Sequence, residues 1–396
     1  MELVVCNSKS ARTRGAASGF PNDVIEEILS RLDAQSVMRC KCVCKSWLSL
    51  ITHPSFKHRH LKNQVPGALL RADDLDCAFS FHVNDNGNHR LWSHPCPNDY
   101  MDCPIVDEKQ NLRMIVFACE NGVICLSYRN VVYLWNPAIR KMKKLPSLPS
   151  PCPMRHLYGL GYHTLTDDFK VVGIPPMKTG GVGFDYDNNF KRGNLVGVYS
   201  LRGPSSWKTL EMPDLFFSDP NCANHQSIFC SFVLNGSIHW LVYYGREIEE
   251  TVLESLGIVA FDMSTEVFKL INSPPSLGGL EAYTAKRMFD LSGCLSLLTF
   301  KRPGLIDMWV MKEYGVSDSW TKHFSFNLSK SSVPSPTDDD FMLYPLGLGR
   351  YSNGDLLLYG GDVFYLYNSK CNRVEYLRPE FSMFQFTTYV ESIFLS

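Results

Sequence analysis

The feature that most limits the fold is a single change of hydrophobic period near residue 62. Between residues 20 and 61, apolar side chains recur at helical spacing, as Val24, Ile28 and Leu32 do. From residue 66 onward the period becomes two, and short apolar runs alternate with turn residues. The sequence therefore predicts an α+β multidomain chain, in which a small helical domain (19–62) precedes an all-β domain (63–396).

Three short helices are predicted in the helical domain. Pro21 suits a helix start, and Asp33 can cap a second short helix. The third helix, which Pro54 would end, is indicated by four side chains at i, i+3, i+4 and i+7: Cys44, Trp47, Leu48 and Ile51. Helices this short bury little apolar surface. The domain is therefore expected to need a partner or a neighbouring domain.

Hairpin signals repeat along the rest of the chain. A turn dipeptide precedes an apolar run at Asn121-Gly122, Asn235-Gly236, Ser292-Gly293 and Asn353-Gly354, and a second run follows each. Equivalent points in these units lie about 55 residues apart, close to the length of a propeller blade. These points are Trp92, Trp135, Tyr199, Phe261, Trp309 and Tyr367. We predict a kelch-like β-propeller of about six blades, with seven shorter blades as an alternative.

The last strand is predicted near the end of the sequence. Two apolar runs, 386–390 and 393–395, read as strand. Because the first and last blades of a propeller must meet, this strand is expected to pair into the first blade.

Charge and composition exclude several function classes. Lys and Arg total 39 and Asp and Glu total 40, so no positive surplus supports nucleic-acid or anionic-membrane binding. Residues 1–18 are small, polar and basic without periodicity, which predicts a disordered leader rather than a signal peptide. Fourteen cysteines without a secretory signal indicate thiols in a reducing compartment. Cytoplasmic and/or nuclear residence is therefore expected.

Motifs that carry catalysis or bind metals do not stand out. Cys40 and Cys44 share a helix face while Cys42 points away, and no second cysteine pair has zinc-site spacing. The run that begins at Asp185 resembles a calcium loop but has Phe190 where glycine is needed. Nothing in the sequence places one of the cysteines as a nucleophile next to a catalytic base. A noncatalytic protein without cofactor or metal is predicted.

Two stretches of the helical domain resemble a plant F-box: residues 19–32 (GFPNDVIEEILSRL) and 42–51 (CVCKSWLSLI). Phe20 stands where the family has leucine, and Asp33-Ala34 replaces a pair containing proline. The β domain resembles the plant F-box-associated domain, also labelled F-box/kelch-repeat. The matching runs include LWNPAIR (134–140), YGLGY (158–162), LNGSIHW (234–240) and WVMKEYGV (309–316).

This resemblance implies a substrate receptor of a Skp–cullin–F-box ubiquitin ligase. The F-box would bind the Skp adaptor, and through it cullin, while the propeller holds an unknown target protein. The adaptor face implied by the family comprises Phe20, Pro21, Ile25, Ile28, Leu29, Val37, Cys40, Val43 and Trp47. Several of these residues, as well as Leu32 and Leu48, equally suit the core of the domain. A small-molecule-binding or enzymatic propeller with an incidental F-box remains the alternative.

The target is expected at long segments between strands, namely 173–194, 213–227, 244–255 and 329–341. Aromatic and arginine side chains dominate protein–protein binding energy. Those of the first two segments are Phe184, Tyr186, Phe190, Arg192, Phe216 and Phe217. They either contact the target or fold back onto the blade edges.

Overall fold

A computed structural model shows how the two domains fold and meet. It describes residues 21–64, 67–72, 78–82, 100–101, 115–128, 131–149, 156–174, 195–211, 216–218, 231–248, 251–277, 285–301, 305–327, 344–346, 356–360, 363–368, 373–377 and 383–396. The predicted leader, 1–18, lies outside these ranges.

Residues 21–64, here called the helical module, form four helices where the apolar pattern predicts three. They are α1 (Asn22–Ser30), α2 (Ala34–Cys40), α3 (Lys45–Thr52) and α4 (Pro54–Asn63). Asp33 caps α2 as expected, because its carboxylate accepts a hydrogen bond from the Ser36 N–H at 2.8 Å. Pro54 follows the end of α3, but it also opens α4, where the missing N–H of proline costs nothing.

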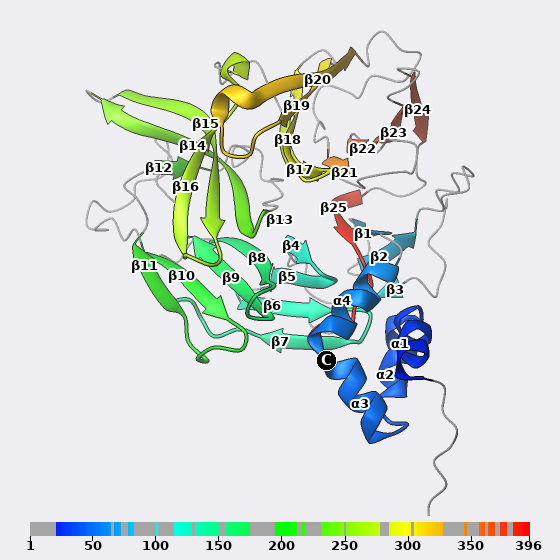
Figure 1. The fold of residues 1–396 in the computed structure, drawn as a ribbon. Helices are drawn as coiled ribbons and strands as arrows, with labels where there is room; N and C mark the ends of the chain where they lie inside the picture. Colours follow the sequence, from blue (N-terminus) through cyan, green and yellow to red (C-terminus); the bar gives the residue numbers. More distant parts are fainter. Residues whose placement is uncertain are drawn as a thin grey trace, which may run out of the picture.

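Past the module, the described strands form six antiparallel sheets, which are the blades of a propeller (Figure 1). Blade 1 holds β25 (Met383–Tyr389), β1 (Gly67–Ala72), β2 (Ala78–His82) and β3 (Tyr100–Met101). Blade 2 holds β4 (Ile115–Glu120), β5 (Val123–Tyr128), β6 (Val131–Asn136) and β7 (Lys141–Lys144). Blade 3 holds β8 (Leu157–His163), β9 (Asp168–Ile174), β10 (Leu195–Ser200) and β11 (Lys208–Glu211). Blade 4 holds β13 (Phe232–Leu234), β14 (Ser237–Ile248), β15 (Thr251–Asp262) and β16 (Val267–Asn272), with β12 (Phe216–Ser218) paired to β14. Blade 5 holds β17 (Ala285–Leu291), β18 (Cys294–Lys301), β19 (Leu305–Met311) and β20 (Trp320–Asn327). Blade 6 holds β21 (Tyr344–Leu346), β22 (Leu356–Gly360), β23 (Val363–Asn368) and β24 (Arg373–Leu377).

The ring closes through β25. This strand pairs antiparallel with β1, as predicted, and contacts β21 on one side and β4 on the other. The innermost strands β4, β8, β13, β17, β21 and β25 thereby contact one another in turn around the ring. The prediction that residues 393–395 continue the strand is wrong. The chain leaves the sheet after Tyr389, and Leu395 has a φ of 68°, which no strand residue adopts.

The repeated turn dipeptides adopt the backbone conformation that their residue types predict. Asn121 and Gly122 have φ values of 49° and 72°, and the Asn235-Gly236 turn repeats both values. Positive φ at both central positions is the type I′ geometry that joins neighbouring antiparallel strands. The predicted equivalent points Trp135, Tyr199, Phe261, Trp309 and Tyr367 all lie in the third strand of their blades. The six-blade prediction is confirmed, while Trp92 lies outside the described residues.

The LNGSIHW run (234–240) and the WVMKEYGV run (309–316) meet between blades 4 and 5. His239 on β14 is fully buried, and its Nε2 lies 2.7 Å from the hydroxyl oxygen of Tyr314 in the β19–β20 turn. The Phe232 ring stacks on the imidazole at 5.1 Å. Burial lowers the pKa of His239 to about 4, so the imidazole is neutral at pH 7.

We expect His239 to make the fold sensitive to acid. Its pKa is lower in the folded chain than in the unfolded chain, so its contribution is complete above about pH 6.5 and is lost as the pH falls toward 4. The loss amounts to about 3 kcal/mol. Thermal unfolding measured between pH 7.5 and 4 should show a shallower decline for His239→Gln than for the original chain. Equal profiles for His239→Gln and the original chain would contradict the assignment.

Removing residues 386–396 should prevent cooperative folding of the propeller. The truncation deletes most of β25 together with the buried side chains of Tyr389, Ile393 and Phe394. Losing three such side chains costs about 2–5 kcal/mol each, which approaches the whole stability of about 5–15 kcal/mol. Calorimetry of the truncated chain should show no native transition, whereas a chain that lacks only Ser396 should unfold normally. A soluble truncated chain with an unchanged melting temperature would mean that the ring closes elsewhere.

Candidate functional site

The helical module exposes apolar side chains on α1, α3 and the turn between α2 and α3. The exposed fraction is 52% for Ile28 and 61% for Val43, and Val24 and Leu48 are also exposed. Water contact of so many large apolar groups on so small a domain is unfavourable unless a partner covers them. This set, Val24, Ile28, Val43 and Leu48, is called the exposed apolar set below.

The residues predicted to form the adaptor face differ in how exposed they are. Ile28 and Val43 are exposed, and so is Pro21 at the N-cap of α1. Leu29 and Val37 are buried in the core of the module, and Ile25, Cys40 and Trp47 pack against that core while remaining partly exposed. Phe20 lies outside the described residues. The adaptor role of all nine residues stays a prediction, but Leu29 and Val37 are held inside the fold.

The core of the module includes residues of the propeller. Ala138, in the β6–β7 turn, and Ile393 are buried in the same cluster as Leu29, Val37, Ile51 and Phe56. The four helices thus complete their core with a neighbouring domain, as the sequence predicts for so small a unit. In Figure 1, α4 lies between the propeller and the other helices, beside the end of the chain.

Residues 390–396, here called the junction segment, lie between the module and blades 2 and 3. The buried Asn136 amide donates to the carbonyl oxygens of Ser392 (3.0 Å) and Phe394 (2.7 Å). The Phe394 ring contacts Tyr162 edge-on at 5.0 Å, and His58 of α4 contacts the same ring at 5.5 Å. His58 also lies 3.2 Å from the Tyr162 hydroxyl. One segment therefore joins α4 to two blades.

Polar contacts hold α4 in place within the module. The buried His60 Nε2 lies 2.9 Å from the Leu32 carbonyl oxygen, and the Asn63 amide donates to the Ser30 hydroxyl at 2.8 Å. Arg59 forms an ion pair with Glu26 of α1 at 3.3 Å. Because α4 binds both α1 and the junction segment, it fixes the orientation of the exposed apolar set relative to the ring.

The module lies at one edge of the ring, and the long segments leave from the other. The module and junction segment contact the β4–β5 turn at Gly122, the β6–β7 turn at Ala138, and the end of β8 at Tyr162. Segment 175–194 joins the opposite ends of β9 and β10. The tip of the β14–β15 hairpin is at that same far edge, since β14 and β15 both extend away from the Asn235-Gly236 turn.

The β14–β15 hairpin projects beyond its blade. β16 pairs with β15 only from Gly257 onward, so residues 251–256 extend about six residues, or roughly 20 Å, past it. The short strand β12 pairs with this projection through Phe216 and Phe217. Figure 1 shows the hairpin at the upper left, far from the helices at the lower right.

Phe216 and Phe217 are two of the residues predicted to bind the target. Their backbone lies on this projection, at the far edge of the ring. Phe184, Tyr186, Phe190 and Arg192 lie outside the described residues, in the segment that leaves the same edge. Their role stays a prediction. The topology brings both segments to one edge, which spacing alone does not show.

The described residues offer little that resembles an enzyme site. No three His, Cys, Asp or Glu side chains among them gather as metal ligands. Burial raises the pKa of the Cys125 thiol, which disfavours the nucleophilic thiolate. None of the described helices is long and apolar enough to cross a membrane.

A helical module packed against the edge of a six-bladed ring defines a β-propeller protein with an appended helical domain. The family profile "F-box domain" matches residues 18–59, and "F-box associated beta propeller domain" matches residues 75–372. The chain therefore belongs to the family of F-box proteins with an F-box-associated β-propeller.

Three relatives from Arabidopsis thaliana are similar along most of their length. The chain is 28% identical to F-box protein At3g07870, over 78% of this chain and 73% of that protein. It is 29% identical to F-box protein CPR1, with coverages of 79% and 74%. F-box/kelch-repeat protein At3g23880 is 25% identical, with coverages of 83% and 84%.

Proposed function

We propose that this protein is the noncatalytic substrate-recognition subunit of a Skp–cullin–F-box ubiquitin ligase. The helical module binds a Skp-type adaptor, which connects it to cullin, and the propeller binds a target protein for ubiquitination and degradation. Such a complex works in the cytoplasm and/or nucleus, where reduced thiols persist.

The observation that carries this proposal is the exposed apolar set on a module whose opposite side is fixed to the propeller. Ile28 and Val43 are more than half exposed, whereas Ala138 and Ile393 of the propeller cover the other side of the core. Aliphatic side chains of this kind form the desolvated centre of stable protein interfaces. The family resemblance supports a Skp-type adaptor as the partner, and the exposure of these side chains supports this face of the module as its binding surface.

Placing a charge on the exposed apolar set should abolish adaptor binding without unfolding the chain. In the double variant Ile28→Asp, Val43→Asp, two carboxylates would have to be buried in an apolar interface, at several kcal/mol each. Affinity for the purified adaptor should fall at least about a hundredfold, as measured by calorimetric titration, while the melting temperature stays unchanged.

The matched control is Leu165→Asp. Leu165 is 85% exposed in the β8–β9 turn, outside the helical module, so this variant should bind the adaptor normally. Leu29→Asp is not informative, because Leu29 is buried and the change should unfold the module. Near-native adaptor affinity of the double variant would rule out this face.

The target-binding part of the proposal places the target at the far edge of the ring, on the β14–β15 projection. We expect that replacing residues 244–255 by Asn-Gly will abolish target capture. Tyr243 and Leu256 are paired across the hairpin, so a two-residue turn can join them without disturbing the pairs closer to the Asn235-Gly236 turn.

Affinity capture from cells with degradation blocked tests this expectation. The full chain should capture adaptor, cullin and target. The shortened chain should keep the adaptor and lose the target. The Ile28→Asp, Val43→Asp variant should lose the adaptor and keep the target. Unchanged capture by the shortened chain would move the target site off the projection. If no protein is enriched by the Ile28→Asp, Val43→Asp variant, the propeller does not act as a protein receptor.

A further inference from the structure

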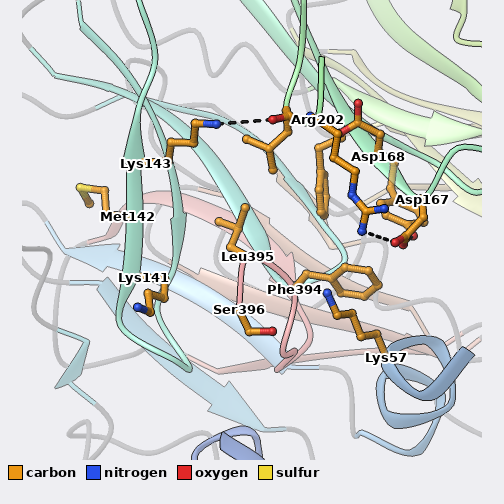
Figure 2. Close-up of a pocket in the computed structure, with 13 residues that line it drawn as sticks. Lys57, Lys141, Met142, Lys143, Asp167, Asp168, Arg202, Phe394, Leu395 and Ser396 are labelled. Atoms are coloured by element: carbon orange, nitrogen blue, oxygen red, sulfur yellow. Dashed lines mark hydrogen bonds and ion pairs between the residues drawn. The ribbon is translucent and has the colours of Figure 1, made fainter. Parts of the chain in front are cut away.

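A pocket lies where the helical module, two blades and the junction segment meet. Its volume is about 310 Å³, within the range of small-molecule sites. Its walls come from α4, from β7, from the β8–β9 and β10–β11 turns, and from Phe394, Leu395 and Ser396 (Figure 2). Neither the proposed adaptor face nor the far edge of the ring includes this pocket.

The charged side chains of the pocket are unequally neutralised. At one wall, Arg202 forms an ion pair with Asp167, and its backbone N–H donates to Asp168 at 3.0 Å. The Tyr162 hydroxyl also donates to Asp167. Asp167 is therefore paired with a cation, whereas Asp168 is bonded to a backbone N–H and forms no ion pair within the described residues. Lys143 donates to the Leu201 carbonyl oxygen at 3.5 Å, which leaves its positive charge uncompensated.

The other walls carry lysines without a carboxylate partner. Lys57 is only 8% exposed, and its ammonium nitrogen lies 5.8 Å from the centre of the Phe394 ring. Lys141 is exposed on β7. Neither residue, nor Lys41 at the end of α2, forms an ion pair with another residue in the part of the chain that the structure describes.

Lys57 and Lys141 are close enough to Lys41, which lies outside the pocket lining, to repel it. Burial, followed by repulsion from Lys57 and Lys141, lowers the pKa of Lys41 to about 8. Burial also lowers the pKa of Lys57, an effect that the charge of Asp167 opposes and that of Arg202 reinforces. Ammonium groups that lose hydration and lack a counter-ion destabilise the fold. An anion bound among them would remove both penalties.

The position of the basic groups indicates what kind of anion fits. Figure 2 shows Lys57 and Lys141 on either side of the Phe394–Ser396 segment, with Lys143 further along the wall. These lysines line different walls of the pocket, so an anion with separate phosphate groups matches their arrangement better than a single small ion does. Phosphate oxygens accept strong charge-assisted hydrogen bonds from lysine.

We propose that this pocket binds a small soluble molecule carrying two or more phosphate groups, with Lys57 and Lys141 as its main contacts. Because the contacts come from the helical module and from β7, the bound molecule stabilises the attachment of the module to the propeller. The proposal is independent of the ubiquitin-ligase function, since it concerns neither the exposed apolar set nor the β14–β15 projection.

Calorimetric titration of the full chain with tripolyphosphate tests this proposal. Saturable binding of one molecule per chain is expected, together with a rise in melting temperature that sodium sulfate at equal ionic strength does not reproduce. Lys141→Gln should weaken binding at least about tenfold, because one charge-assisted contact is lost. Lys141 is exposed, so this variant should fold even if a variant of the buried Lys57 does not.

Lys144→Gln is the matched control. Lys144 is an exposed lysine on the same strand, and it does not line the pocket, so its loss should leave binding unchanged. Absence of saturable binding, or equal weakening by Lys141→Gln and Lys144→Gln, would overturn the proposal. Binding of a phosphoserine peptide without binding of tripolyphosphate would overturn the small-molecule assignment. Full binding by Ile28→Asp, Val43→Asp is expected, which separates this result from any failure of adaptor binding.

Discussion

The packing of the junction segment between the helical module and blades 2 and 3 is the constraint on which the architecture depends. Asn136 has no exposed surface, and its amide donates to two carbonyl oxygens of that segment. Unpaired, these buried polar groups would each cost about 1–3 kcal/mol. Ile393 then completes the core of the module, while Phe394 completes the core shared by blades 2 and 3. Ring closure by β25 and attachment of the module are therefore consecutive steps along one stretch of chain.

Close packing between blades explains several of the distinctive runs. A β-carbon added at Gly159 would lie 2.2 Å from the Trp240 ring, so the YGLGY run leaves room for the next blade. Lys170 forms an ion pair with Glu266 of blade 4 at 2.8 Å. The Trp207 indole donates to the Pro146 carbonyl oxygen at 2.8 Å, between blades 3 and 2. The YGLGY and LNGSIHW runs thus meet at a contact between blades, and the other two contacts join neighbouring blades through residues outside these runs.

The sequence predicts the repeated elements well because their signals are local. Turn dipeptides with positive φ and alternating apolar runs are properties of a few neighbouring residues. α4 escapes prediction because its buried face contains Lys57 and His60 beside Phe56, which hides the helical period. The run at 393–395 resembles a strand, yet Ile393 and Phe394 enter two different clusters. The helix α4 and the non-strand conformation of residues 393–395 are recognised only in the tertiary structure.

The same limit applies to the candidate site. On α1, Leu29 is buried and Ile28 is half exposed, although both belong to one apolar stripe. A broad stripe on a short helix serves a core and a surface together, and the sequence alone does not divide them. The exposure of each residue depends on where α4 and the junction segment lie, which are the two elements that the pattern does not predict.

The separation of the two edges has a mechanical consequence for the proposed role. β14 has 12 residues, so it extends about 40 Å from the turn edge of the ring to the hairpin tip. A target held at that tip would be displaced by any rotation of the module about the junction segment, in proportion to this length. Accurate positioning of a target relative to the adaptor therefore requires a stiff junction. The buried Asn136 bonds and the Phe394 ring contacts hold this junction together, next to Lys57, Lys141 and Lys143, which form no ion pair within the described residues. An anion that neutralises those lysines would act at the point where a small gain in rigidity is most amplified.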